Sequence, residues 1–123
     1  MESDDLEVFD APRLLRVKGD CPQEEMGRMI DPYLLQDDSG LWWCFYKQNG
    51  VSMSSSRDLV HWTYEGHADA GENVCVVKKD DVYYLFHSPK NGIGVMTSKD
   101  CLHWTPTEHL ITLGQTQWPW AQG

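Results

Sequence analysis

A repeated segment constrains the fold of this chain more than any other feature. Residues 50–63 recur with small changes as residues 92–105, at a spacing of 42. Further upstream, residues 41–46 match residues 82–87 at a spacing of 41, so one extra residue separates the two stretches. Both copies carry the pattern Asp-x-x-His-Trp-Thr. Because the match extends over so many positions, the chain is predicted to contain two copies of one structural unit.

Each copy is predicted to form four short strands. In the first copy these are residues 30–36, 41–47, 51–54 and 61–65, and in the second copy they are residues 73–78, 82–88, 93–97 and 103–107. Asn-Gly occurs at the same hairpin in both copies and is a strong turn signal. The only helix expected is one turn within residues 23–29, after Pro22.

A period near forty residues with four strands per unit is typical of a β-propeller blade. The predicted fold class is therefore all-β, with two four-stranded antiparallel blades. The predicted organisation is an N-terminal extension or edge strand over residues 1–29, a first blade over 30–70 and a second blade over 71–114. Residues 115–123 are predicted to begin the connection to a third blade.

Three stretches of the first copy, residues 30–33, 41–46 and 56–62, resemble the five-bladed glycoside hydrolases of family 43 and their family 32 relatives. In the second copy, residues 92–100 are similar to the third strand and following turn of such a blade. The resemblance implies an incomplete five-bladed propeller that binds carbohydrate and hydrolyses glycosidic bonds with carboxylate groups. It defines the blade better than it defines the substrate.

In those families the inner strand of each early blade begins with a carboxylate that faces the central funnel. By this resemblance Asp31, just before Pro32, is the candidate general base or nucleophile. Glu72 is predicted to hold the equivalent place, because eleven residues separate Asp31 from Trp42 and eleven separate Glu72 from Tyr83. The family has Asp there, so Glu72 is a departure. Two carboxylates that face one cavity can share acid–base chemistry.

The other candidates lie near the same end of the predicted blades. The end of each second strand lies beside the start of the first, which makes Lys47 and His87 candidates, and the tryptophans that follow the second blade lead towards a third inner strand. An indole there suits the apolar face of a sugar. The predicted substrate-binding residues are Arg28, Lys47, Asn73, His87, Trp118 and Trp120.

The remaining histidines and acids of the repeat are interpreted as architecture. His61 and His103 occupy the same place in both copies, as do Asp58 and Asp100. A residue that every blade repeats serves every blade, by closing a turn or by packing against a neighbour. These residues are therefore not candidates for the site.

The amino-acid composition limits which classes of binding partner, compartment and cofactor are expected. Ten Lys and Arg against 19 Asp and Glu give a net charge of −9, which repels nucleic acid and anionic lipid. Neither a membrane span nor a signal peptide is present, so a cytoplasmic protein is expected. The four cysteines form no CxxC pair and the histidines show no metal-ligand spacing, so neither a metal nor a cofactor is predicted. Reduced thiols are favoured, and two disulfide bonds remain compatible with the spacing.

Two blades alone leave two open faces, whereas propellers have four to eight blades. Self-association through these faces, or a missing C-terminal portion, is therefore expected. The family's general acid lies on a third blade, and Glu108 is not at an inner-strand start, so an incomplete catalytic set is expected. The alternatives are a glycosidase, whole or as a piece, a carbohydrate-binding relative without catalysis, and a module for blade assembly.

Overall fold

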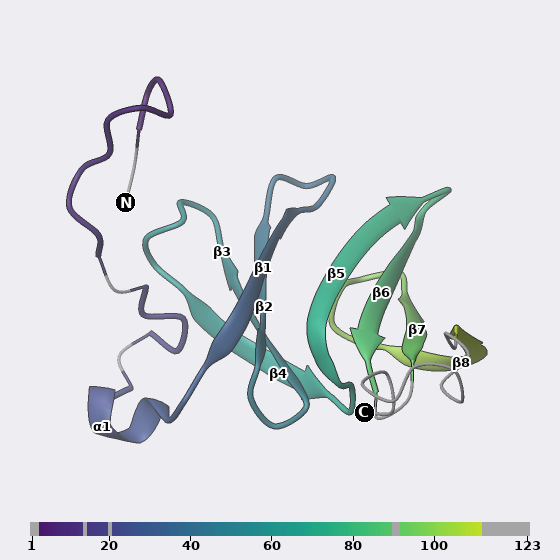
Figure 1. Ribbon diagram of the computed structural model, residues 1–123. Helices are drawn as coiled ribbons and strands as arrows, with labels where there is room; N and C mark the ends of the chain where they lie inside the picture. The colour runs from purple at the N-terminus through teal and green to yellow at the C-terminus, as the bar shows by residue number, and fades with distance from the viewer. Residues whose placement is uncertain (1–2, 14, 20, 90–91, 112–123) are drawn as a thin grey trace.

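Strands are the main regular elements of the chain, and they follow a long N-terminal segment without strands (Figure 1). The computed structural model describes residues 3–13, 15–19, 21–89 and 92–111. Among these, the single helix is α1 (Gln23–Met26). The strands are β1 (Ile30–Gln36), β2 (Trp42–Lys47), β3 (Val51–Ser56), β4 (Thr63–Ala68), β5 (Glu72–Lys79), β6 (Val82–Ser88), β7 (Ile93–Ser98) and β8 (Thr105–Ile111).

The strands form two separate four-stranded sheets. One has the order β1-β2-β3-β4 and the other β5-β6-β7-β8, and every neighbouring pair is antiparallel. Each sheet is therefore a meander of consecutive strands, as expected for one blade. The predicted all-β class with two antiparallel blades is confirmed.

The fourth strand of each sheet begins later than predicted, at Thr63 and Thr105 rather than at residues 61 and 103. The reason is the side chain of the repeated aspartate. Asp58 Oδ1 accepts the backbone N–H of His61 at 2.8 Å, and Asp100 Oδ1 accepts that of His103 at 2.8 Å. These N–H groups are held inside a turn and cannot join the strand ladder.

The main core lies between the two sheets. The β1–β4 sheet contributes Phe45 and Met53, and the β5–β8 sheet contributes Leu85, each with no exposed surface. Trp104 packs against this core, with its ring in an edge contact with Phe45 at 5.9 Å between centroids. The two sheets are thus joined by apolar packing, face against face, as adjacent propeller blades are.

A smaller core covers the other face of the β1–β4 sheet. Val17, from the segment before α1, packs there with Cys44, Tyr46 and Trp62. No described residue before Ile30 belongs to a strand. In the described ranges, the N-terminal extension therefore meets this face with loop residues instead of a strand.

Candidate functional site

β1 and β5, the first strands of the two sheets, contact each other and begin at the same end of the molecule (Figure 1). We call this end the site end. Each strand begins with a bulge, between Ile30 and Tyr33 in β1 and between Glu72 and Cys75 in β5. In the bulges, Asp31 and Asn73 adopt left-handed backbone conformations, with φ of 54° and 55°. Non-glycine residues rarely adopt this conformation, and Asp and Asn tolerate it best.

The pairing shows that Asn73, not Glu72, is the structural equivalent of Asp31. Ile30 pairs with Lys47, and Glu72 pairs with Ser88, so Glu72 corresponds to Ile30. The equivalence expected from residue counting is therefore wrong by one position. The first hairpin is one residue longer in the β1–β4 sheet, where Gln36 pairs with Trp42, than in the other sheet, where Lys78 pairs with Tyr83.

The candidate residues differ in their exposure at the site end. Asp31 and Lys47 are half-buried, whereas Arg28, Glu72 and Asn73 are exposed. The bulge beside Lys47 turns the Asp31 backbone out of the regular ladder. Trp118 and Trp120 lie outside the described residues, so their predicted contribution stays a prediction.

Gln48, in the turn between β2 and β3 that contains Asn49-Gly50, organises the entry into β1. Its Nε2 donates to the carbonyl oxygens of Met26 at 2.7 Å and Arg28 at 3.2 Å. Gly27, with φ of 73°, leaves room for this amide, since a Cβ there would lie 2.9 Å from Nε2. Buried Gln48 Oε1 has no hydrogen-bond partner in the described part of the chain. Only the glycine before Arg28 marks this contact in the sequence.

His87 lies at the site end of β6, where its ring is half-buried. Nδ1 accepts the backbone N–H of Gly71 at 2.8 Å, which ties the connection between the two sheets to β6. A Cβ at Gly94 would lie 2.6 Å from Nε2, so the ring occupies the space that this glycine leaves. Burial lowers the pKa of His87, although Asp69 opposes this shift. His87 Nδ1 is thus engaged with the chain's own backbone, and the predicted role of His87 in substrate binding stays a prediction.

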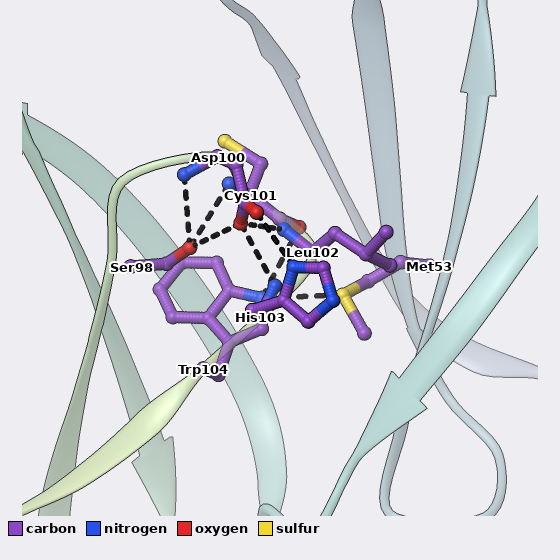
Figure 2. A network of polar contacts seen from close by, with 7 residues as sticks. All are labelled: Met53, Ser98, Asp100, Cys101, Leu102, His103 and Trp104. Atoms are coloured by element: carbon purple, nitrogen blue, oxygen red, sulfur yellow. Dashed lines mark hydrogen bonds and ion pairs between the residues drawn. The ribbon is translucent and has the colours of Figure 1, made fainter.

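The opposite end of each sheet carries the repeated turn network, which Figure 2 shows for the second copy. Asp100 accepts hydrogen bonds from the backbone N–H groups of Leu102 and His103, and its Oδ2 lies 2.6 Å from His103 Nδ1. Although desolvation opposes them, these bonds hold the pKa of Asp100 well below its usual value. In the first copy, the hydrogen bond from the His61 ring is the largest cause of a low pKa at Asp58.

This network is not arranged for nucleophilic catalysis. Ser98 Oγ donates to Asp100 Oδ1 at 2.9 Å, so the aspartate stands between the hydroxyl and the histidine. A nucleophilic serine needs the histidine itself as its neighbour. The geometry agrees with the interpretation that these repeated residues are architecture.

Metal-ligand groups and cysteines were the remaining candidates for chemistry in the described part of the chain. Within the described ranges, no group of three or more His, Cys, Asp or Glu side chains is placed to hold a metal ion. All four cysteines are free. Burial raises the pKa of Cys44 to about 11 and that of Cys101 to about 12, so these two thiols stay protonated.

Comparison with known proteins connects this fold with glycosidases. No protein-family model matches the chain, and no curated protein matches its sequence. Among solved structures, the chain is similar to a protein assigned as a glycosidase from Bacteroides thetaiotaomicron VPI-5482, with 23% identity and a TM-score of 0.55 over 69% of this chain. A glycosyl hydrolase from Bacteroides ovatus matches 66% of the chain with 21% identity and a TM-score of 0.53.

A third solved structure comes from work on the GH130 family of mannoside phosphorylases, which contains glycoside hydrolases that target β-1,2 mannosidic linkages in Candida mannan. It matches 76% of this chain with 22% identity and a TM-score of 0.57. The chain spans only about a third of each of these structures, at 32%, 30% and 34% of their lengths. At this level of identity the similarity shows the fold, and it does not single out family 43 or family 32.

Within the described ranges, no helix has both the length and the apolar character needed to cross a membrane.

Proposed function

We propose that this chain supplies two blades of a carbohydrate-active propeller related to glycoside hydrolase families 43 and 32, and that the site end binds a glycoside. The observation that carries the proposal is Asp31. It is a half-buried carboxylate at the start of an inner strand, in a left-handed conformation that its bulge maintains. Strained residues of this kind cluster at functional sites. The fold shared with solved glycosidases supports the same conclusion.

The proposed chemistry is hydrolysis by carboxylate acid–base catalysis. Asp31 accepts a proton from a water molecule, and the water oxygen attacks the anomeric carbon. As the glycosidic bond breaks, Glu72 assists by delivering a proton to the leaving oxygen, so that Asp31 ends the step protonated and Glu72 ends it ionised. Sugar hydroxyls are proposed to accept hydrogen bonds from Asn73, Lys47 and Arg28.

Four free thiols support a reducing compartment, and we place the protein in the cytoplasm.

The test is hydrolysis of a panel of aryl glycosides that includes β-mannosides. Asp31→Asn should lower the rate by about two orders of magnitude or more while sugar binding survives, because the amide cannot accept the proton. Asp81→Asn is the matched control, since it makes the same change at a 98% exposed side chain in the β5–β6 turn at the opposite end and should leave the rate unchanged. A wild-type chain without activity on any member of the panel would rule out hydrolysis by this chain.

A second candidate is carbohydrate binding without hydrolysis. It is favoured by Asn73, because an amide stands where the second blade presents the equivalent of Asp31. Trp fluorescence titrated with mono- and oligosaccharides distinguishes this candidate. A saturable change in a chain that hydrolyses none of the panel would support it, and no saturable change would contradict both sugar-based proposals.

A further inference from the structure

The contact between the two sheets shows which side chains one blade presents to the next. The β1–β4 sheet contributes Trp43, Phe45 and Met53 to this contact. The β5–β8 sheet contributes Leu85 and Trp104. Trp104 Nε1 donates to Met53 Sδ at 3.2 Å and to the carbonyl oxygen of Cys101 at 3.1 Å. The indole N–H thus has one hydrogen-bond acceptor on its own blade and one on the neighbouring blade.

The outer face of the β5–β8 sheet carries the residues that are equivalent, in the repeat, to those that the β1–β4 sheet contributes to the contact. The register of the strands places Tyr84, Phe86 and Val95 where the first blade has Trp43, Phe45 and Met53. Side chains alternate along a strand, so these residues point away from the core between the sheets. Among the described elements, only β1 and β2 make substantial contact with the β5–β8 sheet, through β5, and Val77 on the outer face is 44% exposed.

The outer face of the β1–β4 sheet carries the residues that are equivalent, in the repeat, to those that the β5–β8 sheet contributes to the contact. Cys44 and Trp62 stand where the second blade has Leu85 and Trp104. The segment around Val17 covers this face, but incompletely. A cavity of about 510 Å³ lies between the segment and the sheet, with Leu15, Met29 and Tyr46 among its lining residues.

The clearest sign of an incomplete cover is the indole of Trp62. Trp62 is 4% exposed, and its Nε1–H has no hydrogen-bond partner among the described residues. Trp104, its equivalent, has two acceptors, one of them on the neighbouring blade. A buried donor without a hydrogen-bond partner costs free energy. The N-terminal segment therefore fits the outer face of the β1–β4 sheet less well than the β1–β4 sheet fits the face that carries Trp104.

We propose that these two outer faces are the halves of one interface between copies of this chain. The outer face of the β5–β8 sheet in one copy packs on the outer face of the β1–β4 sheet in the next, in the manner of the contact within the chain, and the segment around Val17 moves aside. Such a head-to-tail contact forms a ring if its rotation closes.

Solution mass, measured by light scattering across a range of protein concentrations without sugar, tests this proposal. The wild-type chain should form a discrete oligomer. Val77→Glu should shift it to monomer, because a charge on the outer face would be buried without a partner. Val8→Glu, at a position of the N-terminal segment that is 73% exposed and outside both sheets, is the matched control and should leave the mass unchanged.

A second pair of variants separates loss of the interface from loss of the fold. Val77→Lys carries the opposite charge and should also give a monomer, with circular dichroism confirming that the sheets remain. Val17→Ser weakens the cover and should promote association at lower concentration. A wild-type monomer throughout, or a Val77→Glu mass equal to that of Val8→Glu, would overturn the proposal. Because no sugar is present, this outcome leaves the proposed function standing.

Discussion

At the scale of single residues, the repeated aspartate is a hydrogen-bond acceptor that closes a turn. Asp100 receives the N–H groups of Leu102 and His103 together with contacts from Ser98 Oγ and the His103 ring. Without the carboxylate, both N–H groups would lose their protein acceptor. The geometry therefore makes Asp100 a determinant of stability, remote from the proposed chemistry.

Asp100→Ala should lower the free energy of unfolding by about 1–2 kcal/mol, the range for loss of a side chain that caps backbone N–H groups. Urea denaturation followed by circular dichroism measures this change. Glu108→Ala, which also removes one exposed carboxylate but has no such hydrogen bonds, should change stability far less. Equal effects from the two variants would contradict the role of the turn.

His87 makes stability depend on pH near neutrality. Its pKa is lowered in the folded chain by burial, whereas the unfolded chain protonates near the ordinary value of 6.5. The unfolded state therefore binds more protons just below this value, and the contribution of His87 to stability declines as pH falls below about 6.5. Protonation also removes the acceptor for the Gly71 N–H.

His87→Gln isolates this effect, because the Gln side chain can accept the Gly71 N–H but does not titrate. Urea denaturation at a series of pH values from 7.5 to about 5 should show a steeper loss of stability in the wild type than in the variant. The difference between the two proteins removes the contributions of other groups, including His61, whose pKa Asp58 raises. Parallel curves would show that His87 does not titrate as described.

At the scale of elements, the strands were predictable from the repeat and the details of the site were not. Alternating apolar residues and Asn-Gly turns were enough to find all eight strands. Counting could not reveal that one hairpin is a residue longer, so Glu72 was matched to Asp31 in place of Asn73. Residue type could have matched Asn73 to Asp31, since Asp and Asn are the residues that best tolerate the left-handed conformation of the bulge.

The packing of one sheet on the other is the second property of this scale. Leu85 has no exposed surface and lies in the core shared by both sheets. Leu85→Ala should therefore destabilise both blades together, by about 2–5 kcal/mol. Circular dichroism and Trp fluorescence should report one coincident transition at a lower urea concentration. Val60→Ala, at a position that is 61% exposed, is the control, and separate transitions for the two probes would contradict a shared core.

At the scale of the whole molecule, the two ends of the sheets have different roles. The repeated turns at one end share their Asp, His and Trp residues between the copies, whereas the inner strands at the site end begin with residues that differ, Asp31 against Asn73. Residues shared by the copies maintain the blade. Residues that differ between the copies are free to form a site, which is why carbohydrate binding is proposed there.

Amide NMR spectra of the labelled chain, titrated with oligosaccharides that include a β-1,2-mannoside, test this division most directly. We expect saturable chemical-shift changes at Asp31, Asn73 and the neighbouring residues of the site end, with His61 and His103 unchanged at the opposite end. Saturable changes centred on the turns of His61 and His103, or no saturable change with any sugar, would contradict the proposed site.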